Sequence, residues 1–120
     1  KIEPALEDTH GPIVIRDFPP GQAALAKLNE SGWADRFELY LNGKEVANAY
    51  QELNDSGEQR HRFEEFQKQR VDEVPIDEDF MRHLESGMPP AAGIAVGLER
   101  LYMSLFNLEN IEGLFEFGFE

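Results

Sequence analysis

The sequence predicts an α+β fold in which helices flank an antiparallel sheet. A strictly alternating run ends directly at Asn42-Gly43, which is typical of a β-hairpin. Helical spacing of apolar residues appears in separate segments after that hairpin. Hydrophobic residues make up 41% of the 120 residues, which suffices for one core, whereas the length is too short for two ordinary domains. We therefore expect a single domain over residues 1–120.

The residues before the hairpin predict one strand and one short helix. The β-branched run Ile13–Ile15 predicts a buried strand that ends at the breaker Pro19–Gly21. Alanine and leucine dominate Gln22–Leu28, which favours a helix that stops at Asn29. A turn to Gly32 should follow.

The hairpin is predicted from its alternation and its turn. One face of Arg36–Leu41 is apolar and should belong to the core, and the other face should be open. The apolar face consists of Phe37, Leu39 and Leu41, and the open face of Arg36, Glu38 and Tyr40. Asn42-Gly43 favours a two-residue type I′ turn, after which Lys44–Leu53 returns as the partner strand.

Helices are predicted after the hairpin. The N-cap candidates Asn54–Ser56 precede a charged helix over Gly57–Asp72, and a second helix covers Glu78–Glu85. In the first helix, Glu64 and Lys68 are spaced for an ion pair. We expect the buried side chains to be Phe63 and Phe66 in the first helix and Phe80, Met81 and Leu84 in the second.

The last third of the chain predicts a strand and another helix. A break at Gly87–Pro90 precedes Ala91–Gly97, and a helix begins near Leu98. The apolar stripe of that helix consists of Leu98, Leu101, Tyr102 and Leu105. The aromatic end, Ile111–Phe119, predicts a terminal helix and strand.

Charge and composition exclude several kinds of protein. The chain has 24 acidic and 11 basic residues, a net charge of -13, which disfavours a generic binder of nucleic acid or anionic membranes and suits a pocket for Mg²⁺ or an ammonium group. Without cysteine there is no disulfide, thiolate metal site or cysteine nucleophile. No apolar run approaches the length of a membrane span, so we expect a soluble, cytoplasmic protein.

Two acidic residues of the hairpin predict a cation site. A two-residue turn pairs Tyr40 with Glu45, which places Glu38 and Glu45 diagonally on one face, about 7–8 Å apart by the usual cross-strand geometry. Magnesium suits such a pair because it is typically held by one or two carboxylates while substrate phosphates complete its coordination. The alternative is two solvated acids on an exposed face.

A second polar group follows on the returning strand. Asn48, Tyr50 and Glu52 share one strand face, and a carboxylate beside an aromatic ring suits an ammonium group. Strict alternation turns this group away from Glu45. A common site therefore requires a bulge, which we expect near Val46–Ala47; without it the group is ordinary strand polarity.

A third group combines a bare strand face with an arginine. Small residues occupy one face of this strand, which usually means that a ligand or another backbone lies against it. These residues are Gly93, Ala95 and Gly97, whereas Ile94 and Val96 should face the core. Arg100 in the first turn of the next helix would present a guanidinium suited to phosphate or to stacking on a flat ring. The alternative is close packing of a helix, with Arg100 in a surface ion pair.

Two motifs together resemble the C-terminal half of the catalytic domain of class II lysyl-tRNA synthetases. They are FELYLNGKEVANAYQELND (Phe37–Asp55) and GIAVGLERL (Gly93–Leu101), and the resemblance runs from about Gly11 to the end. It implies that Glu38 and Glu45 bind Mg²⁺ on ATP. It also implies that Asn48, Tyr50 and Glu52 line the lysine pocket, with Glu52 taking the ε-ammonium.

The resemblance also assigns the third group. It implies that Arg100 is the motif 3 arginine, which stacks on adenine and reaches the γ-phosphate, that Gly97 lies at the ATP, and that Gly93 and Ala95 lie at the amino acid. Glu99 stands where that motif usually has Asp, which leaves the charge unchanged.

Two features look more like the elongation factor P lysine ligases, a paralogous family. These are Ala95, where lysyl-tRNA synthetases carry Gly, and PPGQAALA at Pro19–Ala26. Such enzymes adenylate (R)-β-lysine with ATP and transfer it to a lysine of elongation factor P. The alternatives are a lysyl-tRNA synthetase, which charges lysine tRNA, and a non-catalytic module that keeps the fold and binds a partner.

The resemblance also predicts what the chain lacks. Class II motif 1, which builds a dimer interface, and motif 2, whose arginine contacts the α-phosphate, should lie upstream of Lys1. We therefore expect a piece of a homodimeric enzyme that is inactive by itself.

Overall fold

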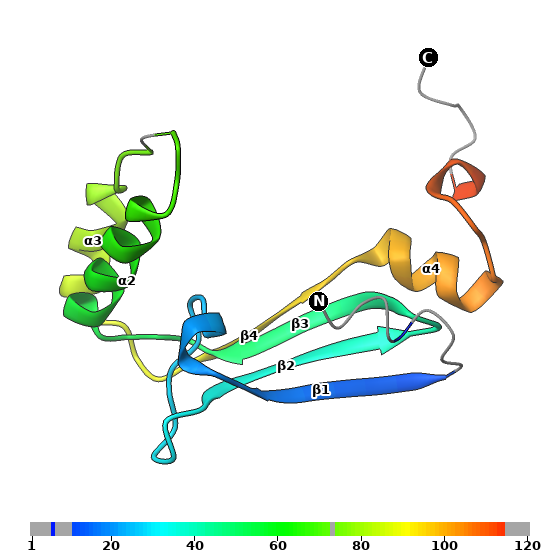
Figure 1. The fold of residues 1–120 in the computed structure, drawn as a ribbon, viewed down its shortest axis with the longest axis horizontal. Coiled ribbons are helices and arrows are strands. Elements are labelled where there is room, and N and C mark those ends of the chain that lie inside the picture. Colours follow the sequence, from blue (N-terminus) through cyan, green and yellow to red (C-terminus); the bar gives the residue numbers. More distant parts are fainter. Residues whose placement is uncertain (1–5, 7–10, 73, 115–120) are drawn as a thin grey trace. The chain divides into compact units, whose positions relative to one another are not determined.

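The computed structural model describes residues 6, 11–72 and 74–114. Its strands are β1 (Pro12–Phe18), β2 (Ala34–Leu41), β3 (Lys44–Gln51) and β4 (Ala92–Val96), and its helices are α2 (Ser56–Lys68), α3 (Glu78–Glu85) and α4 (Leu98–Phe106). Short 3-10 turns cover Pro20–Gln22 and Ile111–Leu114. The four strands form one antiparallel sheet in the order β1-β2-β3-β4 (Figure 1), which confirms the predicted α+β class.

The predicted hairpin is confirmed. Asn42 and Gly43 have φ values of 48° and 74°, and the type I′ turn requires positive φ at both positions. The turn is also tied to other elements, because the Asn42 side-chain amide donates to the carbonyl of Ser104 at 3.2 Å and its oxygen accepts from the amide of Gly11 at 3.1 Å. The partner strand runs to Gln51, and Glu52 continues the pairing as an isolated bridge with Ala26.

The chain divides into two compact units. The first contains the described residues of Lys1–Arg16, Phe37–Ala49 and Ile94–Glu120, and the second comprises Asp17–Arg36 and Tyr50–Gly93. In the first unit α4 is fixed to the hairpin by Ser104, whose hydroxyl donates to the carbonyl of Leu41 at 3.3 Å. The buried side chains of this unit are Tyr40, Val46, Ala47, Ala49, Met103 and Ser104.

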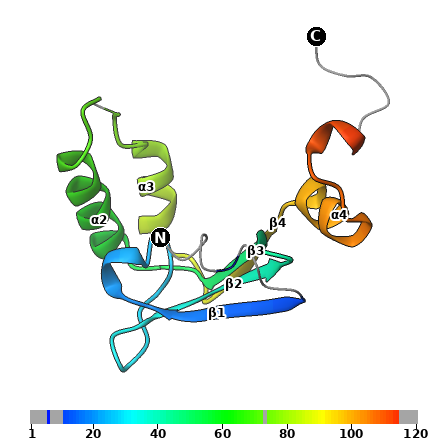
Figure 2. The ribbon, with the colours of Figure 1, turned by 45° about the vertical axis from the view of Figure 1, so that its right-hand side comes forward.

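The second unit is built on α2 and α3, which lie side by side in Figures 1 and 2. Asp55 and Asp77 cap the two helices, accepting from the amides of Glu58 and Phe80 respectively. The core of this unit consists of Phe18, Ala23, Ala26, Ala34, Leu53, Gln59, Met81 and Leu84.

The helix predicted over Gln22–Leu28 is wrong. A 3-10 turn ends at Gln22, Ala24 adopts a positive φ of 50°, and Ala26 and Leu28 pair with Glu52 and Ala34. Local propensity favours a helix here, but the backbone groups of this segment find partners in the neighbouring strands instead.

Several predicted burial patterns are also wrong. Val14 is 56% exposed because β1 lies at one end of the strand order, so the strand is not buried. On β2, Phe37 of the apolar face is exposed and Leu39 and Leu41 are half-buried, whereas Tyr40 of the face expected to be open is buried. Alternation separates the two faces of a strand but does not decide which face is covered.

The helices show the same kind of difference. In α2, Phe66 is exposed and Lys68 pairs with Glu65, three residues before it, instead of with Glu64. In α3, Met81 and Leu84 are buried as predicted, but Phe80 is exposed and makes a tilted ring contact with Phe63, their centroids 6.1 Å apart.

The strand and helix boundaries near the end of the chain follow the prediction, but the expected burial does not. Ile94 and Val96 are exposed instead of facing the core, and most of the α4 stripe is exposed too, namely Leu98, Tyr102 and Leu105. Periodicity identifies an apolar stripe without supplying what covers it. Of the predicted terminal helix and strand, the described part is the 3-10 turn Ile111–Leu114, and the residues after Leu114 lie outside the described residues.

Candidate functional site

The two acidic residues of the hairpin lie on one face with Tyr40. The two-residue turn places Tyr40 opposite Glu45, and residues opposite each other share a face. The buried Tyr40 donates its hydroxyl hydrogen to Oε2 of Glu38 at 2.9 Å, which orients that carboxylate. Tyr40 was predicted to lie on an open face, and its role as the partner of Glu38 was missed, although its spacing two residues after Glu38 could have suggested it.

Arg100 contacts the hairpin within the first unit. Its Nη1 donates to the carbonyl of Glu45 at 3.3 Å and lies 3.9 Å from Oε2 of the same residue. Its stem also covers Gly97, since a Cβ at Gly97 would lie 3.7 Å from Cβ of Arg100. We call these residues, Glu38, Tyr40, Glu45, Gly97 and Arg100, the hairpin cluster.

The chemistry of this cluster suits a magnesium-bound phosphate. Two carboxylates provide hard oxygen ligands, and Arg100 provides the guanidinium that pairs with phosphate oxygens. Among the described residues, no group of three or more His, Cys, Asp or Glu gathers as a metal site. A cation held here by Glu38 and Glu45 would therefore need ligands from water or from a bound phosphate.

The pairing of β3 with β4 is regular at both of its ends. The amide of Gly97 donates to Val46, and the amide of Glu52 donates to Ala91, both at 2.9 Å. Val46 and Glu52 are six positions apart, as are Ala91 and Gly97, so neither strand carries a net extra residue in between. The bulge predicted near Val46–Ala47 is not seen in this pairing, so Asn48 lies on the strand face opposite to that of Glu45, and the bulge that a common site would require is absent from the described pairing.

The same register assigns an opposite residue to each predicted pocket residue. Within the first unit Asn48 lies across from Ala95, and within the second unit Tyr50 lies across from Gly93. Both Asn48 and Tyr50 are half-buried, whereas Gly93 and Ala95 are exposed. The bare residues of β4 therefore share a face with the polar residues of β3.

Glu52 occupies the space beside Gly93 in the second unit. A Cβ built on Gly93 would lie 2.7 Å from Oε1 of Glu52, closer than real Cβ contacts come. Gly93 is therefore bare because a carboxylate crosses it, a reason that the sequence did not reveal. We call Tyr50, Glu52 and Gly93 the pocket cluster.

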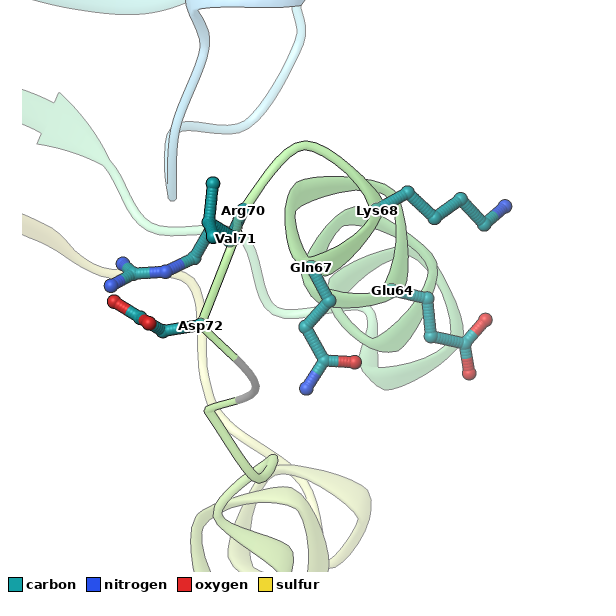
Figure 3. A pocket seen from close by; sticks show the side chains of 6 residues that line it. All are labelled: Glu64, Gln67, Lys68, Arg70, Val71 and Asp72. Atoms are coloured by element: carbon teal, nitrogen blue, oxygen red, sulfur yellow. The ribbon is translucent and has the colours of Figure 1, made fainter.

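The hollows of the second unit lie elsewhere. One, of about 500 Å³, is at the C-terminal end of α2 (Figure 3), where Arg70 and Asp72 extend toward each other and Glu64 and Lys68 point away from the helix. Another, of about 390 Å³, is mostly apolar and is lined by Phe63, Phe66 and Phe80 among others. No predicted site residue lines either hollow.

Comparison with known proteins identifies the class. Residues 4–119 match the family described as tRNA synthetases class II (D, K and N), so the chain belongs to this family. This agrees with the fold, which corresponds to part of a class II synthetase catalytic domain.

The chain is similar to two kinds of ligase within that family. It is 44% identical to the elongation factor P--(R)-beta-lysine ligase of Haemophilus influenzae, and the match covers 98% of this chain and 38% of the relative. It is also 44% identical to the ligase of the same name from Avibacterium paragallinarum, and that match covers 91% of this chain and 36% of the relative. It is 45% identical to the lysine--tRNA ligase of Enterococcus faecalis, over 97% of this chain and 25% of the relative. The chain thus spans little more than a third of the first group's length. In the part of the chain that the structure describes, no helix is both long and apolar enough to cross a bilayer.

Proposed function

We propose that this chain is part of an ATP-dependent ligase that activates (R)-β-lysine and transfers it to a lysine side chain of elongation factor P. The observation that carries the proposal is the contact between Arg100 and Glu45, because it joins the phosphate-binding arginine to one of the two acids suited to magnesium. Glu38 and Glu45 would hold Mg²⁺ on ATP, and Arg100 with Gly97 would receive the nucleotide.

Magnesium would neutralise phosphate charge and so make the α-phosphate easier to attack. In activation, a carboxylate oxygen of the amino acid attacks the α-phosphorus and pyrophosphate leaves. In transfer, the acceptor amine attacks the carbonyl carbon of the adenylate and AMP leaves. The role of the hairpin cluster is to orient the triphosphate and to balance its charge.

We propose that Asn48, Tyr50 and Glu52 recognise the side chain of the amino acid, with Gly93 and Ala95 close to its backbone; this proposal rests on the family resemblance and on the contacts of Glu52, not on a shared strand face with Glu45. The Glu52 carboxylate would pair with the ε-ammonium, and the ring of Tyr50 would add a cation–π attraction. The contact of Glu52 with the bare Gly93 supports this assignment, because it fixes one carboxylate beside a surface without side chains.

Sequence identity does not separate the two ligase classes, since both lie at 44–45%. Ala95 and Pro19–Ala26 favour the β-lysine ligase. The second candidate is therefore a lysyl-tRNA synthetase, and a non-catalytic module is the third. Retention of Glu38, Glu45, Glu52 and Arg100 together opposes the module, which would not need all four.

We also propose that residues 1–120 form the C-terminal part of one catalytic domain in a homodimeric, cytoplasmic enzyme. The short coverage of the relatives supports a longer enzyme. Motifs 1 and 2 would come from the rest of that enzyme.

Exchange of pyrophosphate into ATP by the full-length enzyme tests the proposal. We expect exchange that depends on the amino acid and is faster with (R)-β-lysine than with lysine. Glu45→Gln should lower the exchange rate by at least tenfold. The reason is that loss of one group that stabilises charge in the transition state typically costs roughly 10²–10³ in rate. Exchange that needs neither amino acid, or that survives the substitution, would contradict it.

A further inference from the structure

We propose that Arg62 is a positioning residue for the amino-acid pocket, because it holds the backbone segment that pairs beside Glu52 and so fixes the Glu52 carboxylate. The inference rests on the proposed role of Glu52. It concerns contacts within the second unit alone.

Arg62 reaches from α2 to the backbone of an extended segment. Its Nη1 donates to the carbonyl of Ala26 at 2.7 Å and to that of Ala24 at 3.0 Å. Its Nε donates to Oε1 of Glu58 at 2.8 Å, one turn earlier on α2, which holds the guanidinium in place. The Arg62 side chain is only 17% exposed, and its charge-assisted hydrogen bond to the Ala26 carbonyl is partly buried.

The segment held by Arg62 contains a strained residue. Ala24 has a φ of 50°, in the left-handed region that a residue with a Cβ rarely adopts. Strain of this kind persists only where surrounding contacts fix the backbone. The hydrogen bond to the Ala24 carbonyl is such a contact, and the full burial of Ala26 is another.

The same segment flanks Glu52 in an antiparallel bridge. Ala26 lies opposite Glu52, and the hydrogen bonds of the bridge lie on either side of that pair. They run from the amide of Lys27 to the carbonyl of Gln51 at 2.8 Å and from the amide of Leu53 to the carbonyl of Leu25 at 2.9 Å.

On its other side Glu52 is held by the strand that leads to Gly93. Its amide donates to the carbonyl of Ala91 at 2.9 Å, and its carboxylate lies against Gly93. The backbone of Glu52 is thus fixed from both sides, and Arg62 secures one of them. Without Arg62, the backbone of residues 24–26 can relax its strain. The backbone of Glu52, and with it the carboxylate, is then no longer held in one position.

The test compares matched arginine variants in the full-length enzyme. We expect Arg62→Met to raise KM for the amino acid roughly tenfold, the usual effect of losing a hydrogen bond to a charged group, with KM for ATP and kcat changed less than about twofold. Arg62→Lys should restore part of the loss, because an ammonium group still donates to carbonyl oxygens. Arg60→Met is the control, since Arg60 lies on the same helix but pairs with Glu78 on α3. It should leave all three constants unchanged.

The outcomes separate this inference from the proposed function. Glu52→Gln, tested in parallel, must raise the amino-acid KM, or the proposed function itself fails. If Glu52→Gln has that effect and Arg62→Met does not, or if Arg62→Met changes KM for both substrates alike, Arg62 has no positioning role. If Arg62→Met does not fold, Arg62→Lys provides the test. The inference then requires that Arg62→Lys raises the amino-acid KM severalfold and that Arg60→Met leaves this KM unchanged.

Discussion

At the scale of single residues, the carboxylate of Glu52 explains the glycine at position 93. The close approach of Oε1 leaves no room for a Cβ there. The sequence predicted that a ligand or another backbone lies against the bare face of this strand, whereas at Gly93 it is the side chain of Glu52, the residue after β3, that does so. A pocket for an ammonium group needs such a fixed carboxylate.

Gly93→Ala should impair amino-acid binding without unfolding the protein. The new methyl would meet Glu52 at 2.7 Å, and the carboxylate, as the end of a flexible side chain, would move away. We expect KM for the amino acid to rise by about tenfold, the value of one good charge-assisted contact. Steady-state kinetics of the full-length enzyme measure it, and Gly21→Ala is the control because a Cβ there meets no atom within 4 Å. An unchanged KM would show that the carboxylate position does not matter.

Ala95→Gly should shift the preference between lysine and (R)-β-lysine. Ala95 lies on the same face as Asn48, and its methyl takes room where the amino-acid backbone would lie. Moving the amino group from the α to the β carbon changes where that room is needed. One methyl is typically worth about 1–3 kcal/mol, or roughly 10- to 200-fold, in discrimination.

The expected result is a higher kcat/KM for lysine relative to (R)-β-lysine in the Ala95→Gly enzyme. Adenylation kinetics with both amino acids on both enzymes measure the ratio. If the ratio does not change, the distinction from lysyl-tRNA synthetases rests on Pro19–Ala26 alone.

At the scale of elements, the sequence predicts most boundaries because local signals set them. Asn42-Gly43 defines its turn by the positive φ values that both residues tolerate, and Asp77 caps α3 at the predicted start. The helix predicted over Gln22–Leu28 fails because Ala26 pairs with Glu52, which is 26 positions away in the sequence, and Leu28 pairs with Ala34 across a turn. The predicted burial of side chains is wrong for a related reason, because alternation in the sequence does not show which face of a strand another element covers.

In the candidate site, too, the sequence predicts the features that depend on local signals and misses those that depend on tertiary contacts. The turn register alone places Glu38 and Glu45 on one face, and the motif alone suggests Arg100. The contact of Arg100 with Glu45, the hydroxyl of Tyr40 on Glu38 and the carbonyl contacts of Arg62 all join residues through side-chain geometry. No periodicity in the sequence encodes such contacts.

The ion pair between α2 and α3 should make stability depend on pH. The hydrogen bond from Arg60 lowers the pKa of the Glu78 carboxyl below its ordinary value of 4.5. A carboxyl with a lowered folded pKa stabilises the protein above its unfolded pKa, and this contribution is lost as pH falls through the folded pKa.

Arg60→Met should therefore lower the thermal midpoint slightly at neutral pH, and the difference between the two midpoints should narrow as the pH falls through the lowered pKa of Glu78. Thermal unfolding of both proteins between pH 3 and pH 7 measures it. Arg82→Met should change the midpoint less, because Arg82 pairs with Asp79 on its own helix and its charge is the smallest of the causes that lower the Glu78 pKa. A difference that stays constant across this range would assign the effect of Arg60 to packing.

At the scale of the whole molecule, we propose that the 120 residues contribute one part of a larger catalytic domain. The chain spans little more than a third of the β-lysine ligases that it resembles. The hairpin cluster supplies two acids and one arginine, whereas the family resemblance assigns the α-phosphate contact to an arginine of motif 2.

The 120-residue chain alone should therefore not exchange pyrophosphate into ATP. Removing one group that stabilises transition-state charge costs roughly 10²–10³ in rate. The measurement is exchange by the purified chain at saturating ATP, Mg²⁺ and either amino acid, with the full-length enzyme as the positive control. Robust amino-acid-dependent exchange by the chain would mean that its own residues complete the ATP site.

The most direct test of the central claim is the fate of the activated amino acid. The full-length enzyme would be given ATP, Mg²⁺ and labelled (R)-β-lysine, with elongation factor P in one reaction and lysine tRNA in another. We expect that label becomes attached to elongation factor P, that the tRNA stays unlabelled, and that Glu52→Gln removes the labelling. Label on the tRNA, or labelling of elongation factor P that does not depend on Glu52, would contradict the claim.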